Sequence, residues 1–71
     1  MSWNLIPIGQ AAKLLHVHPT TLRYNETRDG QWTEVMGMRI RVYRFDGGQR
    51  RYDRAEILSE LSRFRRELSL R

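Results

Sequence analysis

The chain has 71 residues, which is the size of one small domain and leaves too little core to enclose a deep pocket or an elaborate active site. It contains no cysteine, which excludes both a disulfide framework and a thiolate metal site. The formal net charge of +5 and the sequence pI of about 10.7 favour an anionic partner, such as nucleic acid or a lipid surface.

The excess positive charge is concentrated in the middle of the chain. Residues 1–37 contain as many basic as acidic side chains, whereas residues 38–54 contain six arginines and two aspartates. The six are Arg39, Arg41, Arg44, Arg50, Arg51 and Arg54. This clustering indicates where an anionic partner would bind.

The start of the chain, MSWNLIPIGQ, lacks the basic residues and the apolar run of a secretory signal. No stretch of the sequence reaches the length needed to cross a membrane. We therefore expect a cytoplasmic protein without membrane contact.

A short helix is predicted for IGQAAKLL, directly after Pro7. Its apolar side chains recur with the spacing of one helical face. They are Ile8, Ala11, Ala12 and Leu15. The following HVHP interrupts the pattern: His16 stands where left-handed backbone is expected, and Pro19 suits the first position of a new helix. The pattern predicts a helix, a tight turn and a second helix.

The second helix is predicted from about Pro19 to Asp29, with Gly30 as its C-terminal stop. Leu22 is its one strong apolar anchor, so most of its surface must face water or a ligand. Polar side chains at helical spacing share the other face. They are Thr20, Arg23, Tyr24 and Thr27. An ordinary solvated face explains the same pattern.

From Trp32 to Tyr52 the period changes toward two, which is typical of half-buried strands. Apolar and polar side chains alternate over residues 38–43, the turn DGG reverses the chain, and Gln49 to Tyr52 return as a partner strand. A regular strand would direct Arg50 and Arg51 to opposite faces. The segment TEVMG could add a third strand, with Gly37 in a bulge or an extra turn.

The last helix is predicted to begin after Asp53, with Glu56 completing the spacing of a capping box. Its apolar stripe is expected to be core as far as Leu61. The stripe contains Ile57, Leu58, Leu61, Phe64 and Leu68. Beyond Leu61, the segment from Arg63 to Arg71 is either a protein contact or a frayed helix end.

Two segments together, IGQAAKLLHVHPTTLRYNE and GGQRRYDRAEIL, resemble the MerR-like winged helix over about residues 5–61. This group includes the DNA-binding heads of MerR regulators, the N-terminal heads of some serine transposases and the small phage excisionases. The resemblance implies an α+β fold, a winged helix-turn-helix, with two short N-terminal helices, a basic β-hairpin wing and a C-terminal helix. One domain would span residues 1–71, with the helix-turn-helix at about 8–29, the wing at about 33–52 and the last helix at about 54–68.

Three positions depart from the pattern of that group. His16 stands where glycine is usual, and His18 stands where serine usually caps the second helix. An aromatic residue is common where this chain has Asn25, and Trp32 is the candidate to fill the space that it leaves. The wing is also longer before its glycines.

The resemblance implies that the second helix enters the major groove of DNA and that the wing reaches the neighbouring minor groove or its phosphates. Arg23 is the expected main contact of the helix and Arg51 that of the wing, while Tyr52 is expected to pack against the last helix. The expected contacts of the helix region are Thr20, Thr21, Arg23, Tyr24, Thr27 and Arg28. Those of the wing are Arg39, Arg41, Arg44, Gln49, Arg50 and Arg51.

Catalysis, metal binding and cofactor binding are not expected. The sequence shows no nucleophile with a base, no phosphate-binding loop and no pair of catalytic carboxylates. His16 and His18 could suggest a metal, but without a third ligand two such histidines more often serve a turn and a cap.

Within the group, the end of the chain at Arg71 favours the excisionases, which are recombination directionality factors, over regulators and transposases with further domains. That resemblance implies copies that bind adjacent attachment-site repeats cooperatively, bend the DNA and direct a partner integrase toward excision. Two alternatives remain: a small MerR-like transcriptional regulator, and an accessory module that binds an acidic protein.

Overall fold

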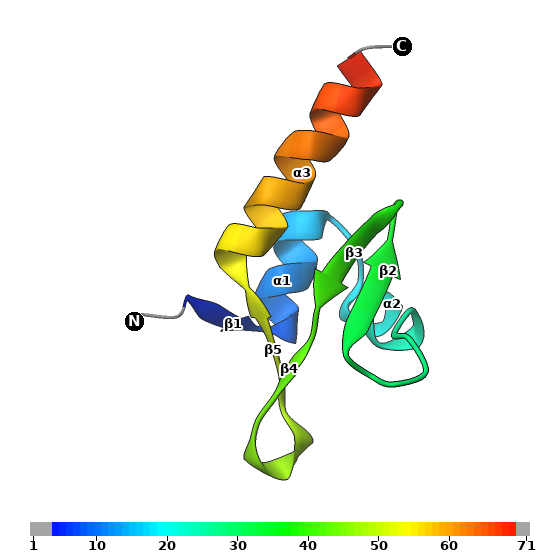
Figure 1. Ribbon diagram of the computed structural model, residues 1–71. Helices are drawn as coiled ribbons and strands as arrows, with labels where there is room; N and C mark the ends of the chain where they lie inside the picture. The colour runs from blue at the N-terminus through cyan, green and yellow to red at the C-terminus, as the bar shows by residue number, and fades with distance from the viewer. Residues whose placement is uncertain (1–3, 70–71) are drawn as a thin grey trace.

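The computed structural model describes residues 4–69 and has mixed α and β structure, which confirms the α+β class (Figure 1). The chain begins with strand β1 (Leu5–Pro7) and helices α1 (Ile8–Leu15) and α2 (Pro19–Tyr24). Strands β2 (Trp32–Val35), β3 (Met38–Arg41) and β4 (Tyr43–Arg44) follow. The short 3-10 turn η1 (Asp46–Gly48), strand β5 (Arg50–Asp53) and helix α3 (Arg54–Ser69) complete the described part.

The turn between α1 and α2 forms as the sequence predicts. His16 has φ 57° and ends α1, and its N–H donates to the Lys13 carbonyl at 3.2 Å. His18 caps α2, because its Nδ1 accepts from the Thr20 N–H at 3.1 Å, and Pro19 follows at the first helical position. Both histidines therefore have the local roles expected of them.

The predicted extent of α2 is wrong, because the helix ends at Tyr24 and not at Asp29. The Asn25 carbonyl accepts from the Glu34 N–H at 3.1 Å, and Thr27 donates its N–H to the Trp32 carbonyl at 2.8 Å. These bonds draw the chain into the sheet in place of another helical turn. Gly30 closes the turn that follows, with its N–H bonded to the Thr27 carbonyl at 2.9 Å.

The segment expected to form one hairpin contains two (Figure 1). In the first, β2 pairs with β3 through a two-residue loop in which Met36 and Gly37 have φ 50° and φ 77°. The extra strand in TEVMG is therefore present. In the second, β4 pairs with β5 across η1, and β5 also pairs with β1, giving the strand order β1-β5-β4. Strand β1 was missed by the sequence analysis.

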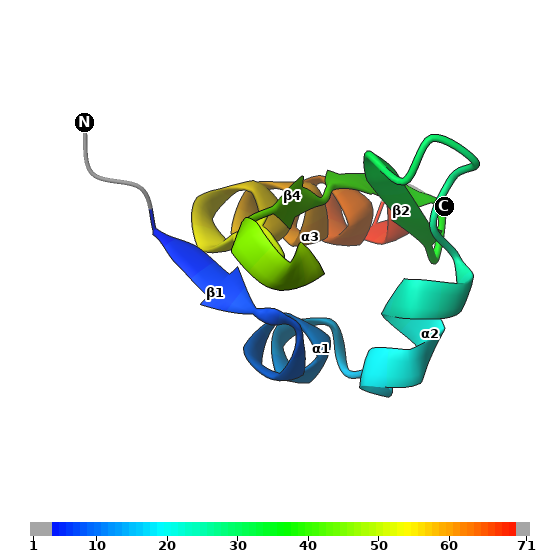
Figure 2. The ribbon, with the colours of Figure 1, turned by 90° about the horizontal axis from the view of Figure 1, so that it is seen from below.

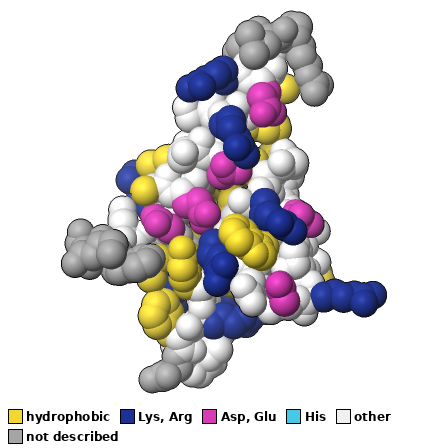
Figure 3. All heavy atoms as spheres, in the orientation of Figure 1, with side chains coloured by type: hydrophobic (Ala, Val, Ile, Leu, Met, Phe, Trp, Pro, Cys, Tyr) yellow, Lys and Arg dark blue, Asp and Glu magenta, His cyan; other side chains and the backbone are white. Residues whose placement is uncertain are grey.

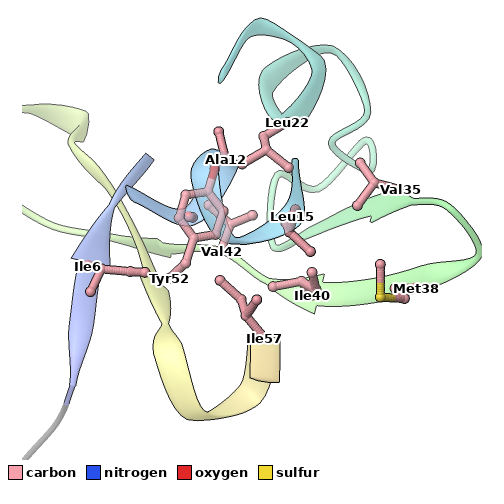
Figure 4. Packing of buried hydrophobic residues seen from close by; sticks show 11 residues of the cluster. Ile6, Ala12, Leu15, Leu22, Val35, Met38, Ile40, Val42, Tyr52 and Ile57 are labelled. Atoms are coloured by element: carbon pink, nitrogen blue, oxygen red, sulfur yellow. The ribbon is translucent and has the colours of Figure 1, made fainter. Parts of the chain in front are cut away.

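The core lies between the helices and the inner sides of both sheets (Figure 4). It comprises Ile6, Ala11, Ala12, Leu15, Leu22, Val35, Met38, Ile40, Val42, Tyr52 and Ile57. The Tyr52 ring is fully buried, and its hydroxyl has no hydrogen-bond partner among residues 4–69. Trp32 does not fill the core space predicted for it, because it lies half-buried on the outer side of β2.

Helix α3 is capped by Asp53, whose Oδ1 accepts from the Ala55 N–H at 2.9 Å. The capping box is wrong: Glu56 does not bond back to Asp53, since its Oε1 accepts from the Arg41 N–H on β3 at 3.1 Å. Leu61 and Phe64 pack on the core, which therefore extends one turn farther than predicted.

Beyond the core, α3 projects from the body, and its Leu68 side chain is exposed (Figure 1). Of the predicted apolar stripe, Leu58 is also exposed. None of the helices within residues 4–69 has the length and apolar character needed to span a membrane.

Candidate functional site

The C-terminal end of helix α2 carries two exposed side chains. Leu22 is its buried anchor, whereas Tyr24 is 83% exposed and Arg23 is also exposed. Thr20 and Thr21, on the first turn, are half-buried. An aromatic ring left in water beside a cation is suited to contact a partner, because its burial on binding would be favourable.

Thr27 and Arg28, two contact residues predicted on this helix, lie in the loop after it. The Thr27 hydroxyl donates to the Asp29 carboxylate, which also accepts from the Gln31 N–H at 3.1 Å. These two hydrogen bonds, with a smaller contribution from the charge of Arg39, lower the pKa of Asp29. Arg28 is exposed in the same loop. Thr27 and Arg28 are thus next to α2 in sequence but do not share its helical face.

The β4–β5 hairpin extends away from the body and carries an exposed tip (Figure 1). Phe45 at this tip is 52% exposed. Arg51 lies along the hairpin, with Nη1 donating to the Arg50 carbonyl at 3.0 Å and Nη2 to Gln49 Oε1 at 3.1 Å. Gly47 and Gly48, with φ 81° and 75°, let the chain reverse direction between β4 and β5.

Glu26 joins the end of α2 to both strands of this hairpin. Its carboxylate accepts from Arg44 Nη2 at 2.7 Å and from Arg50 Nε. The Glu26 side chain is only 10% exposed, and that of Arg50 is 28% exposed. The hydrogen bond to Glu26 raises the pKa of Arg50. Two of the predicted contact arginines are therefore held by a carboxylate of the same chain.

Gly30 makes room for one of these arginines. A Cβ on Gly30 would lie 3.3 Å from Arg44 Nη2, and the φ of 70° is itself unfavourable for other residues. The loop after α2 therefore packs directly against the guanidinium that Glu26 binds.

The outer side of the β2–β3 hairpin carries a second group of charged and aromatic side chains, which we call the Trp32 face. The guanidinium carbon of Arg39 lies 5.4 Å from the Trp32 ring centroid, and that of Arg41 lies 5.1 Å from it. Arg39 also pairs with the exposed Glu34 at 3.4 Å. The Trp32 face comprises Trp32, Glu34, Arg39 and Arg41. Over this hairpin, Figure 3 shows a hydrophobic surface flanked by basic side chains.

The Trp32 face is separate from the exposed face of α2. Thr33, between Trp32 and Glu34, points inward and donates its hydroxyl to the Leu22 carbonyl of α2 at 2.8 Å. Since alternate strand residues point to opposite sides, Trp32 and Glu34 point away from α2. In the view from below, β2 lies beside α2 at the same end of the molecule (Figure 2), so the two surfaces belong to neighbouring elements and differ in the direction that they face. The structure thus places Arg39 and Arg41 on a different face from Arg23 and Tyr24.

Sequence reasoning missed Glu26, Phe45 and the pairing of Trp32 with two arginines. Glu26 lies 18 residues from Arg44 and 24 from Arg50, a separation that no local pattern can reveal. Phe45 offered a weak signal, because it is an apolar residue beside the turn DGG, where polar residues are usual.

Within residues 4–69, no three His, Asp or Glu side chains lie close enough to hold a metal ion together. No protein family model matches the chain, and comparison with curated proteins and with solved structures found no match either.

Proposed function

We propose that the protein is a winged helix-turn-helix DNA-binding protein of the MerR-like superfamily and acts as an excisionase, an architectural factor for site-specific recombination. In this proposal α2 is the recognition helix and the β4–β5 hairpin is the wing. The observation that carries it is the bonding of Glu26 to Arg44 and Arg50, which fixes a basic hairpin beside an exposed helix.

Helix α2 would enter the major groove of duplex DNA. Arg23 would form paired hydrogen bonds with guanine O6 and N7, or with a phosphate, and Tyr24 and Thr20 would contact neighbouring groups. The packing of α2 supports this role. Leu22 faces the core, and the two most exposed of these groups, Arg23 and Tyr24, face outward.

The hairpin would lie along the neighbouring minor groove. Arg51 is the proposed phosphate contact, because its guanidinium lies along the hairpin and is not part of the Glu26 ion pairs. For Arg44 and Arg50 we propose a positioning role beside the DNA contact predicted for them, because their bonds to Glu26 join the hairpin to the chain directly after α2.

Phe45 supplies a means of bending DNA. Proteins that kink DNA often insert an apolar side chain between base steps from the minor groove, at a cost of a few kcal/mol per step that new contacts offset. A phenylalanine 52% exposed at the tip of a basic hairpin is placed for this purpose. Bent attachment-site DNA, bound by adjacent copies of the protein, would then favour an integrase assembly that excises.

The proposal is tested by measuring DNA bending with donor and acceptor dyes on the two ends of a duplex. We expect the protein to shorten the end-to-end distance, and we expect Phe45→Ala to reduce this effect. Met36→Ala is the matched control, because Met36 is 46% exposed at the tip of the other hairpin. If Phe45→Ala leaves the bending unchanged, the proposal that Phe45 inserts between base steps is contradicted.

An excision assay with an integrase and its attachment DNA tests the biological role. The protein should raise the yield of excised product and lower the yield of integration. DNA binding to a palindromic site, with no effect on either product, would instead identify a transcriptional regulator.

A further inference from the structure

The proposed DNA interface does not use the Trp32 face, although this surface contains the residue types typical of binding sites. Tryptophan and arginine are enriched among the residues that contribute most to protein–protein binding, and charged side chains around them usually form the rim. Here Trp32 and Arg41 are half-buried, whereas Glu34 and Arg39 are exposed around them. The same composition would not arise from core packing, because all four side chains point outward from β2 and β3.

We propose that the Trp32 face binds an acidic segment of a partner protein, with carboxylates on Arg39 and Arg41 and an apolar side chain of the partner against Trp32. The two guanidiniums flank one indole ring at 5.4 Å and 5.1 Å, so a carboxylate bound to either would lie at the edge of that ring. Stacking on the ring restrains each arginine while its N–H groups remain able to donate.

The ion pair between Arg39 and Glu34 does not prevent this binding. Its side chains are 59% and 57% exposed, so water screens the attraction and the pair contributes little. Glu34 gives the partner a position for a basic side chain, which makes the surface selective for a mixed, mainly acidic segment.

A protein partner fits this surface better than DNA does. Glu34 stands beside Arg39 and can take a basic side chain of a mixed segment, and Trp32 can take an apolar one, whereas a DNA backbone presents only phosphates to both. The Trp32 face also points away from α2, so the two surfaces face different directions. The inference does not depend on DNA binding: the hairpin would recruit its partner whether α2 reads DNA or not.

Fluorescence of Trp32 tests the inference in the full chain. Trp3 is the other tryptophan, so the variant Trp3→Phe leaves Trp32 as the reporter. The probe is a short peptide of glutamates around one phenylalanine, compared with the same peptide carrying lysines and with a short DNA duplex. We expect the acidic peptide to change the emission and the lysine peptide to have no effect.

Two further variants, each also carrying Trp3→Phe, separate this surface from general charge attraction. Arg39→Gln with Arg41→Gln should weaken binding of the acidic peptide about tenfold or more, because both charges of the site are removed. Arg63→Gln with Arg66→Gln removes the same charge from α3 and should weaken it by much less. Far-UV circular dichroism establishes that each variant is folded.

Equal weakening by the two double variants would overturn the inference, because it would show attraction to net charge alone. An unchanged Trp32 emission with the acidic peptide would overturn it as well. The inference would also be overturned if the duplex changes Trp32 emission and binds the Arg39 and Arg41 double variant more weakly, since DNA would then be the ligand of this face. If the protein with Trp3→Phe binds the acidic peptide but does not bind the duplex, the result contradicts the proposed function and supports the inference about the Trp32 face.

Discussion

Replacement of Glu26 by glutamine tests whether one buried carboxylate holds the β4–β5 hairpin against α2. Glu26→Gln keeps the size of the side chain but removes its charge. Arg50, whose side chain is 28% exposed, then loses its carboxylate partner, and Arg44, which is 40% exposed, loses its own. The change therefore acts on both strands of the hairpin at once.

The magnitude follows from the two hydrogen bonds. A hydrogen bond to a charged group contributes about 1.5–3 kcal/mol, and the partial exposure of both arginines reduces this value. The glutamine oxygen still accepts one bond. We therefore expect the free energy of unfolding to fall by about 2 kcal/mol, a large part of the stability of so small a domain.

Urea unfolding followed by far-UV circular dichroism measures this loss. The matched control is Glu34→Gln, which removes one carboxylate from an exposed pair whose side chains are 57% and 59% exposed. It should change the free energy of unfolding by less than about 0.5 kcal/mol. If Glu26→Gln lowers the free energy of unfolding no more than Glu34→Gln does, the ion pairs of Glu26 do not hold the hairpin in place.

Three other substitutions test the interface and the core. Arg51→Ala should weaken binding to all DNA sequences and lower the slope of log affinity against log salt by about one unit; Arg66→Ala, which removes one charge from α3, is the control, and equal effects would remove Arg51 from the interface. Arg23→Ala should cost about 1–3 kcal/mol on a selected site and less on random DNA in a competition assay, whereas equal losses would make Arg23 a phosphate contact. Burial raises the pKa of Tyr52 to about 12, so its neutral phenol contributes stability that is complete below pH 10.0 and is lost as the pH rises toward 12. Tyr52→Phe should therefore remove the part of the fall in unfolding free energy between pH 10.0 and 12 that the phenol causes. At neutral pH it should change the unfolding free energy by less than about 1 kcal/mol, since the hydroxyl has no partner within residues 4–69. If the fall at alkaline pH is as large as in the unchanged protein, groups other than Tyr52 cause it.

The features that the sequence predicts well are those with local causes. His16 and Pro19 mark the turn between α1 and α2 because backbone conformation at these positions depends on neighbouring residues. Asp53 caps α3 for the same reason, through a bond to the N–H two residues later. The alternation over residues 38–42 places Met38, Ile40 and Val42 in the core, as predicted.

The errors arise where distant residues compete with local preference. Helix α2 stops early because Asn25 bonds to Glu34, and the pattern from Pro19 to Gly30 contains no sign of that contact. Glu56 has the spacing of a capping box, yet its carboxylate bonds to β3 because the helix packs there. Strand β1 is too short to show a period, and its pairing with β5 joins residues far apart in the chain, such as Leu5 and Asp53.

In the candidate site, too, features with local causes could be predicted and features that depend on distant contacts could not. The exposed face of α2 could be predicted from the helical spacing of Thr20, Arg23 and Tyr24. The different surroundings of the arginines could not be predicted, because whether Arg44 and Arg50 are bound by Glu26 depends on how the hairpin packs beside the loop after α2. Charge counting identifies a basic segment but does not show which guanidiniums are held by the protein itself.

The most direct test of the central claim, that α2 and the β4–β5 hairpin bind DNA together, is nuclear magnetic resonance mapping during titration with a DNA duplex. We predict that amide shifts concentrate in α2 and in the β4–β5 hairpin, at Arg23, Tyr24 and Arg51, and that the affinity falls steeply as salt rises. An absence of shifts at low salt, or shifts confined to the Trp32 face, would contradict it.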